Sequence, residues 1–246
     1  MFERAWLDPV ALPLHRRAVE AGWTPDALDR FCLRCGRDTG PHECDADGCS
    51  VCRERRLPWD RIVRLGSYVP PLSEWVCEVK FTRAAVLGLE IGRMLGRQVA
   101  GAAGLGEGRM PPGPPVIVPV PSTLRRRLSR GIDHSRAIAR GVGSVLQAPV
   151  LGRALWRTHR PSQRSVAFSG RAANVSQSIG VSRGAMKRLT GRWVLLVDDV
   201  TTSGATLRAA ARAIREAARN CSGEGPLEIW ACVAAVTPER GTARGG

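Results

Sequence analysis

VLLVDDVTTSGATL, residues Val194–Leu207, joins an apolar run to two adjacent acids and a turn rich in hydroxyl groups and glycine. An uninterrupted apolar run such as Val194–Val197 is typical of a strand that is covered on both faces of a parallel sheet. Beyond the turn, apolar residues recur at helical spacing from Leu207 to Ala218, which predicts a helix to about Arg219. The stretch therefore predicts one strand–turn–helix unit of an α/β fold.

The turn in this unit is suited to a phosphorylated sugar. Free backbone amides, hydroxyl groups and the positive end of the helix dipole all attract a phosphate at the start of a helix. The candidate phosphate-binding residues are Val200, Thr201, Thr202, Ser203, Gly204, Ala205 and Thr206. The carboxylates of Asp198 and Asp199, just before them, can hold vicinal sugar hydroxyls.

Val194–Leu207 resembles the 5-phosphoribosyl-1-pyrophosphate (PRPP) motif of type I phosphoribosyltransferases, whose acids bind the ribose 2′ and 3′ hydroxyls. The resemblance implies their fold, a mostly parallel α/β sheet flanked by helices. A Walker B strand is a rival interpretation, but the chain lacks the GxxxxGK[ST] motif that accompanies it. Two more rival interpretations are the acidic strand end of a response-regulator receiver and an ordinary buried strand with a capping loop. Agreement over fourteen consecutive positions favours PRPP binding.

Near the amino end, two CxxC pairs are separated by thirteen residues. The four cysteines are Cys32, Cys35, Cys49 and Cys52. Each pair can present two thiolates to one tetrahedral zinc ion, and the short loop between the pairs closes easily. Four protein ligands leave no open position, which predicts a structural Zn²⁺ site in a zinc ribbon. Cys44 or His42 could replace one ligand, while a disulfide or a redox role is a competing use of these cysteines.

Length, composition and charge are compatible with a basic α/β protein. Its 246 residues suit one α/β domain with a small added module. No apolar stretch approaches a membrane span and the first residues lack a signal-peptide pattern, so we expect a cytoplasmic protein. The formal charge of +15 invites a nucleic-acid partner. However, Lys80 and Lys187 are the only lysines, and such an arginine bias is typical of a GC-rich genome, so charge alone leaves that partner open.

The pattern divides the chain into an N-terminal helical segment (1–30), a double zinc-ribbon-like module (31–60), a phosphoribosyltransferase domain (61–240) and a disordered tail (241–246). The Gly/Pro-rich stretch 101–115 predicts a flexible connection. The remaining predicted elements are helices around Pro9–Ala21, at Ala84–Val99 and around His134–Leu146, and strands at Ile62–Tyr68, Val116–Val120, near Pro149–Ala154, at Trp193–Val197 and at Ile229–Val236.

Three further stretches narrow the family. Val118-Pro-Val-Pro121, followed by an arginine-dense segment, resembles the VPVP…RGF-N-Q stretch of ComF-type phosphoribosyltransferases. Arg157–Asn174 resembles their R…Q…R-x-x-N loop, and Ser67–Phe81 resembles the "KF" segment that joins their zinc module to the transferase domain. The resemblance covers about residues 28–236 in the family's order. It departs at Gly131–His134, where the family usually has G-F-N-Q.

The ComF resemblance implies roles for further residues. Pro121, Ser122 and Arg125 would belong to a loop that binds pyrophosphate through Val120–Arg127. Arg157, Gln163 and Arg171 would lie in a lid that excludes water, with both arginines stabilising the leaving group. Asp198 and Asp199 would act at the ribose directly or through Mg²⁺, which would bridge ribose and pyrophosphate oxygens. The alternative role of Arg125 is part of a solvated basic face. The alternative role of Arg157, Gln163 and Arg171 is to anchor their loop structurally.

Two functions follow from these expectations. The first is an enzyme, a phosphoribosyltransferase (a glycosyltransferase of pentosyl groups) that moves phosphoribosyl from PRPP to an unidentified nitrogenous base with release of pyrophosphate. The ComF resemblance links it to natural competence and to the uptake and processing of single-stranded DNA. The second is a PRPP-binding nucleic-acid or partner protein that uses the fold without turnover. The sequence identifies no acceptor and leaves the oligomeric state, a homo-oligomer included, open.

Overall fold

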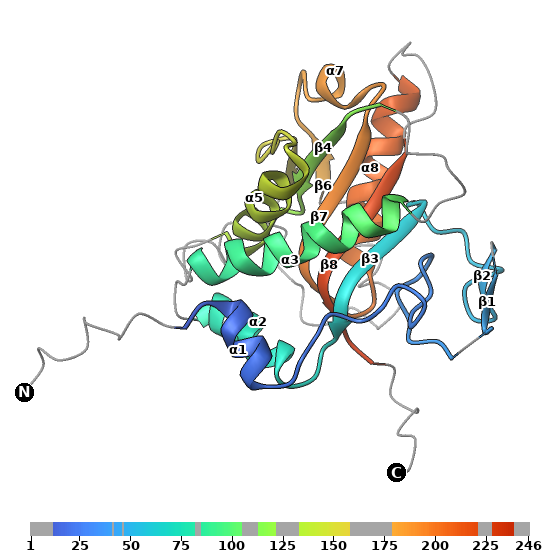
Figure 1. Ribbon diagram of the computed structural model, residues 1–246. Coiled ribbons are helices and arrows are strands. Elements are labelled where there is room, and N and C mark those ends of the chain that lie inside the picture. Colours follow the sequence, from blue (N-terminus) through green and yellow to red (C-terminus); the bar gives the residue numbers. More distant parts are fainter. Residues whose placement is uncertain are drawn as a thin grey trace, which may run out of the picture.

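A parallel sheet of four strands lies at the centre of the computed structural model (Figure 1). The structure describes residues 12–40, 42–45, 47–81, 85–104, 113–121, 133–157, 179–220 and 228–238. The strands, in spatial order, are β3 (Arg61–Ser67), β8 (Ile229–Val236), β7 (Trp193–Thr201) and β4 (Pro115–Pro119). Every neighbouring pair is parallel, so the carboxyl ends of all four strands lie at one edge of the sheet.

Helices cover both faces of this sheet. One face carries α1 (Leu14–Glu20), α2 (Leu72–Phe81), α3 (Ala85–Gly104) and α5 (His134–Leu146). The other face carries α7 (Met186–Leu189) and α8 (Ala205–Asn220). The predicted α/β class, a mostly parallel sheet flanked by helices, is therefore confirmed.

Two small antiparallel pairs complete the described elements. One joins β1 (Cys44–Asp45) to β2 (Gly48–Cys49) within the cysteine-rich region. The other joins β5 (Leu155–Arg157) to β6 (Ile179–Val181), on either side of residues 158–178. None of the described helices combines the length and hydropathy that a membrane span requires.

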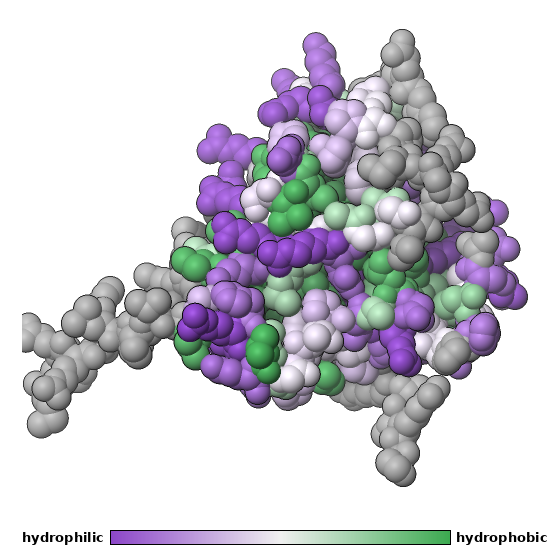
Figure 2. Space-filling view, viewed as in Figure 1, coloured by the Kyte–Doolittle hydropathy of each residue, from purple (hydrophilic) through white to green (hydrophobic). Residues whose placement is uncertain are grey.

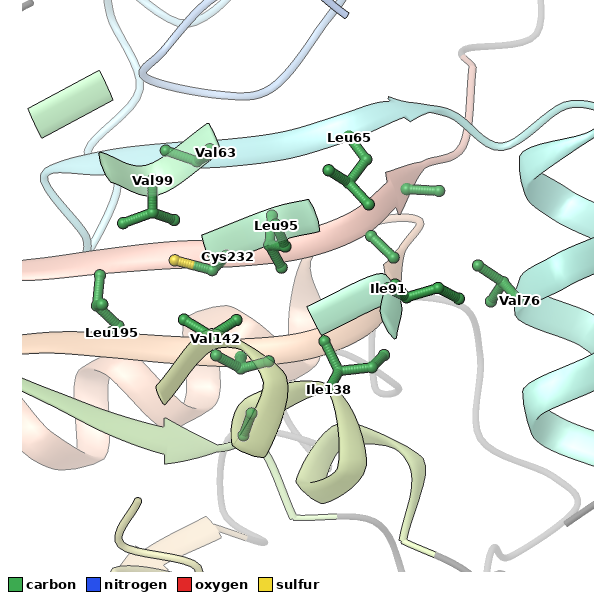
Figure 3. Close-up of a cluster of buried hydrophobic side chains, with 14 of the residues drawn as sticks. Val63, Leu65, Val76, Ile91, Leu95, Val99, Ile138, Val142, Leu195 and Cys232 are labelled. Atoms are coloured by element: carbon green, nitrogen blue, oxygen red, sulfur yellow. The ribbon is translucent and has the colours of Figure 1, made fainter. Parts of the chain in front are cut away.

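Alternate residues of the central strands pack into two separate cores. Figure 3 shows the core beneath α3, where Val63 of β3, Leu195 of β7 and Cys232 of β8 meet side chains of α2, α3 and α5. Their neighbours along the chain, such as Val194 and Leu196, face α8 instead. Continuous apolar runs are what a sheet buried on both faces requires. On the outer surface viewed in Figure 2, hydrophilic side chains separate the hydrophobic patches.

Glycines allow α3 and α5 to pack closely together. A Cβ atom on Gly92 of α3 would lie 2.0 Å from the carbonyl oxygen of Ile138, and one on Gly141 of α5 would lie 2.2 Å from the carbonyl oxygen of Leu89. These distances are far shorter than any real Cβ contact, so the two backbones touch here. The contact fixes the position of α5, whose amino end lies beside the acid pair.

Most element boundaries agree with the sequence, and four differ. The predicted helix around Pro9–Ala21 is α1, which begins at Leu14 within the described residues. Strand β7 continues past Val197 to Thr201 because its ladder with β8 extends to Val236. The strand predicted near Pro149–Ala154 is only a single parallel bridge from Val150 to Ile117, and the regular strand starts later, at Leu155. Helix α3 continues past Val99 to Gly104, so residues 101–104 of the predicted flexible connection are helical instead. Residues 105–112 of that connection and the predicted tail 241–246 lie outside the described residues.

Candidate functional site

The acid pair lies inside the carboxyl end of β7, where Asp198 pairs with Val233 of β8. The Asp198 Oδ1 atom accepts hydrogen bonds from the hydroxyl of Ser135 and from the backbone amide of Asp199, both at 2.9 Å. The Asp199 Oδ1 atom accepts a bond of 2.6 Å from the amide of Val200. Both carboxylates are partly buried and held by these bonds, so they are oriented rather than free to rotate.

Pro121 lies next to the acids because β4 and β7 run side by side. The backbone amide of Val120 donates to the carbonyl of Val197 at 2.8 Å, which continues the ladder past Pro119. Pro121 therefore follows β4 at the same edge at which Asp198 follows Val197. The start of the predicted pyrophosphate loop and the acid pair are thus brought together.

Tyr68, whose own role the sequence analysis leaves unassigned, also lies close to the acids. Its backbone amide donates to the carbonyl of Val236, and its hydroxyl lies 3.1 Å from the sulfur of Cys77. The hydrogen bond with Cys77 and partial burial, together with the negative charge of Asp199, raise the pKa of Tyr68 to about 12. The tyrosine thus remains a neutral hydroxyl next to the acid pair. In the sequence, only its position within the Ser67–Phe81 segment points to a role for Tyr68 near the site.

The hydroxyl-rich turn connects β7 to α8. Thr202 and Ser203 are exposed, and Gly204 has a φ of +69°, a left-handed conformation that favours glycine. The guanidinium of Arg208 donates to the carbonyl oxygen of Ser203 and braces the turn from within α8. Since α8 begins at Ala205, amides of its first turn lack intrahelical acceptors and face the same end as the hydroxyls.

The other predicted site residues are described only in part. Arg157 ends β5, where it is half-buried and pairs with Ile179 of β6. The remaining candidates lie outside the described residues, namely Ser122, Arg125, Gln163 and Arg171. The acid pair, the turn and Pro121 therefore form the described part of the site.

The four cysteines of the two CxxC pairs converge in the module that precedes β3. Their sulfur atoms lie within 4.8 Å of one another. The Cys32–Cys52 and Cys35–Cys49 sulfur distances are both 3.6 Å, and that of Cys49–Cys52 is 3.7 Å. Four sulfurs at about 2.3 Å from one tetrahedral zinc ion would be about 3.8 Å apart. The cluster therefore has the dimensions of a zinc site, and none of the described cysteines forms a disulfide.

The chemistry of these thiols also suits a cation. Burial and the neighbouring sulfurs of Cys32 and Cys49 raise the pKa of Cys52 to about 11. The hydrogen bond with Cys32 and burial raise the pKa of Cys35 further still, whereas the same hydrogen bond lowers the pKa of Cys32 to about 4. Several buried thiolates would repel one another unless a bound dication compensated their charge. The residues present therefore fit a structural Zn²⁺ ion.

Cys44 and His42 are both exposed, and neither belongs to the cluster. Cys44 lies opposite Cys49 in the β1–β2 pair. Gly48 has a φ of +100°, and a Cβ atom there would lie 2.6 Å from the Cys52 sulfur. The hairpin therefore depends on glycine at this position.

Arg34 and Arg64, to which the sequence motifs assign no role, stabilise the cysteine-rich module. Arg34 acts within the module, and Arg64 connects the module to the sheet. Arg34 donates to the carbonyls of Asp47, Arg53 and Arg55 around the cysteine cluster. Arg64 of β3 is only 1% exposed and donates to the carbonyl of Gly36 at 2.9 Å. It also forms ion pairs with carboxylates on two separate segments, Asp26 and Asp38. Both contacts are long-range, which is why no local pattern marks them.

Fold and site together define an α/β protein with a parallel sheet, an acid pair and a hydroxyl-rich turn at its carboxyl edge, and a four-cysteine cluster. The chain matches no family model. It is 27% identical to "Competence protein F" of Haemophilus influenzae over 203 residues, or 81% of this chain and 82% of that protein. It is also 27% identical to "DNA utilization protein YhgH" of Escherichia coli K12 over 183 residues, or 74% of this chain and 75% of that protein.

These relatives confirm the resemblance of the chain to the ComF family. A similarly named YhgH protein of Salmonella typhi is 27% identical over 204 residues, 81% of this chain and 82% of that protein. Among solved structures, the crystal structure of the protein TT1426 from Thermus thermophilus aligns with 63% of this chain and 86% of that chain, with 14% identity and a TM-score of 0.31.

Proposed function

We propose that the chain binds PRPP at the carboxyl edge of the sheet and transfers its phosphoribosyl group to a nitrogenous acceptor. The observation that carries the proposal is the meeting of the acid pair, the hydroxyl-rich turn and Pro121 at one edge. Crevices at the carboxyl ends of strands are where open α/β sheets bind their ligands. The three features supply groups for the ribose, the 5′-phosphate and the pyrophosphate, respectively.

The acid pair would hold the ribose. Vicinal hydroxyls need acceptors in fixed positions, and the hydrogen bonds from Ser135 and from the amides of Asp199 and Val200 fix both carboxylates. In the reaction, the C1–oxygen bond to pyrophosphate breaks and pyrophosphate leaves with the electron pair. The acceptor nitrogen forms a bond to C1 and releases its proton. The negative carboxylates stabilise the positive charge that develops on the ribose.

The turn would hold the 5′-phosphate. Exposed hydroxyls of Thr202 and Ser203 and the amino end of α8 provide donors and a positive dipole end. Val200–Thr206 would form this site, as the motif resemblance implies. Arg208 keeps the turn in its conformation through its bond to the Ser203 carbonyl.

The leaving group would be handled by the two flanking loops. Pro121, Ser122 and Arg125 would bind pyrophosphate, while Arg157, Gln163 and Arg171 would close over it and exclude water. A bound Mg²⁺ would neutralise charge on the pyrophosphate oxygens. These roles rest on the ComF resemblance and on the position of Pro121 at the edge of the site.

The cysteine cluster would hold one structural Zn²⁺, and the protein would be cytoplasmic and act on incoming DNA during competence. The names of the relatives, which refer to competence and DNA utilization, support this biological role. They also favour the second candidate function, a PRPP-binding protein that contacts nucleic acid without turnover. The charge of +15 is compatible with both.

Release of pyrophosphate from PRPP distinguishes the two functions. With candidate nitrogenous bases as acceptors, we expect release by the wild-type protein and none by the double variant Asp198→Asn, Asp199→Asn. Cys32→Ser, which lies outside the site, is expected to retain activity per folded molecule. PRPP binding without pyrophosphate release across the acceptors would favour the non-catalytic function.

A further inference from the structure

Cys44 is a cysteine of the module that the four-sulfur cluster does not include. Its side chain is exposed, whereas Cys49 and Cys52 of the cluster are buried. Cys44 nevertheless lies close enough to Cys32 and Cys49 for their charges to act on its thiol. The module therefore presents one accessible thiol beside the four sulfurs of the cluster.

The β1–β2 pair places Cys44 directly opposite Cys49. Opposite residues of an antiparallel pair have Cα atoms about 4.5–5.5 Å apart and side chains on the same face. A disulfide joins Cα atoms that are about 4.4–6.8 Å apart, so a bond between these two cysteines suits the existing strand separation. The Asp47 amide donates to Oδ1 of Asp45 at 3.0 Å, and Arg53 forms an ion pair with Asp45. These contacts hold the hairpin, and with it the two cysteines, in register.

A small oxidant can reach the cluster from a neighbouring cavity. The cavity has a volume of about 1000 Å³, and Cys35 and Cys49 are among its lining residues. Peroxide is far smaller than this cavity, and it oxidises thiolates, the form in which cysteines bind a metal. Of the two cysteines, Cys49 is the one that lies opposite a thiol outside the cluster.

We propose that Cys44 and Cys49 form a disulfide in response to peroxide and that this bond removes Cys49 from the metal site. This modification rests on the Zn²⁺ site of the proposed function. The Cys49 thiolate attacks one peroxide oxygen, so that an S–O bond forms, the O–O bond breaks and hydroxide leaves. The sulfur of Cys44 then attacks the resulting sulfenic acid, and the S–O bond breaks as the S–S bond forms. The displaced hydroxide leaves as water with the Cys44 proton, so both sulfurs are oxidised and the peroxide is reduced.

The disulfide would destabilise the module reversibly. Without Cys49, only Cys32, Cys35 and Cys52 remain, whereas a structural zinc site needs four ligands. Because the binding free energy of structural zinc is also folding free energy, loss of the ion loosens the module. Reduction of the disulfide restores the fourth ligand. In the absence of Cys44, by contrast, the sulfenic acid at Cys49 would be oxidised further to sulfinic acid, which is irreversible.

Treatment of the zinc-loaded protein with hydrogen peroxide tests this modification. A chromogenic chelator measures released zinc, and peptide mass spectrometry after alkylation of free thiols locates the disulfide. The test variant is Cys44→Ser. The control is Cys77→Ser, because Cys77 is also partly exposed but belongs to α2, outside the module. Melting temperatures of the untreated variants verify their folding.

We expect the wild type to release about one zinc ion per chain and to lose two hydrogen atoms as the Cys44–Cys49 disulfide forms. Dithiothreitol and added zinc should then restore both the metal and the melting temperature. Cys44→Ser should instead gain two oxygen atoms at Cys49 and should not regain its zinc. Cys77→Ser should behave as the wild type does.

Three results would overturn this role of Cys44. They are a disulfide confined to the four cluster cysteines, recovery of zinc by Cys44→Ser as complete as that of the wild type, and retention of zinc by the wild type under peroxide. Protein purified without zinc would instead refute the zinc site of the proposed function. Titration of the untreated protein with PRPP tests the rest of that function separately.

Discussion

The hydroxyl of Ser135 donates a 2.9 Å hydrogen bond to Oδ1 of Asp198, and this bond connects the amino end of α5 to the carboxyl end of β7. Ser135 is 6% exposed, and 63 residues separate it from its acceptor. Its position depends on α5, which the close glycine contact with α3 holds in place. Helix packing on one face of the sheet thus determines the orientation of a carboxylate at its edge.

Replacement of Ser135 by alanine should weaken PRPP binding severalfold. The Asp198 carboxylate would keep its bond from the Asp199 amide but lose the side-chain donor, so it would be less well oriented. A lost hydrogen bond to a charged group should lower the free energy of unfolding by about 1.5–3 kcal/mol. Titration calorimetry and urea unfolding measure the two effects.

The matched control is Ser144→Ala, whose exposed hydroxyl bonds only to the Gly141 carbonyl of the same helix within the described contacts. It should leave PRPP affinity unchanged. Equal affinities for Ser135→Ala and Ser144→Ala would show that the bond to Asp198 does not matter for the sugar.

A methyl group on Gly92 should force α3 and α5 apart. Its Cβ would lie 2.0 Å from the Ile138 carbonyl oxygen, and overpacking of this kind costs about 2–3 kcal/mol of unfolding free energy. Gly101→Ala, whose Cβ would meet only a Leu28 side-chain atom at 3.7 Å, should instead stabilise the helix by up to about 1 kcal/mol. Urea unfolding compares them, and similar stabilities would contradict the close helix contact.

Titration of Tyr68 reports directly on its surroundings because it is the only tyrosine of the chain. The absorbance of tyrosinate should have a midpoint near pH 12 in the folded protein, against about 10 for an ordinary tyrosine. The pKa is raised by folding, so the stability contributed by neutral Tyr68 is complete below about pH 10 and is lost as pH rises toward 12.

Two variants identify the causes of that shift. Cys77→Ala removes the hydrogen-bond partner and should lower the midpoint most, and Asp199→Asn should lower it by a smaller amount. A midpoint that does not respond to Asp199→Asn would place Tyr68 away from the acid pair.

Purified protein should contain about one equivalent of zinc, and a chelator should lower its melting temperature. Structural zinc contributes to folding free energy, so Cys32→Ser should lose both metal and stability. Cys44→Ser serves as the control because Cys44 is exposed and outside the cluster, and it should retain the metal. Zinc loss in Cys44→Ser alone, measured by atomic absorption, would assign a different ligand set.

The sequence predicts elements best where a pattern is local and strong. The helix His134–Leu146 and the strand Ile229–Val236 have the predicted boundaries, since an amphipathic repeat defines the first and an unbroken apolar run the second. At Pro149–Ala154 the apolar residues form only one bridge, from Val150 to Ile117, because a strand also needs a partner. Likewise, β7 continues through its acids because β8 lies alongside it.

The sequence predicts the site residues only where they lie close together along the chain. Asp198–Thr206 and the two CxxC pairs are local motifs, and the structure places each set together. The contacts that orient them join distant segments, as Ser135 does with Asp198 and Arg64 with Asp38. No period or spacing encodes such contacts, since they depend on how helices and modules pack.

Titration calorimetry with PRPP and Mg²⁺ tests the central claim most directly. We predict saturable binding of one PRPP per chain by the wild-type protein, and no measurable heat with the folded double variant Asp198→Asn, Asp199→Asn. Absence of binding by the wild type, or equal binding by the folded double variant, would contradict a PRPP site at the carboxyl end of β7.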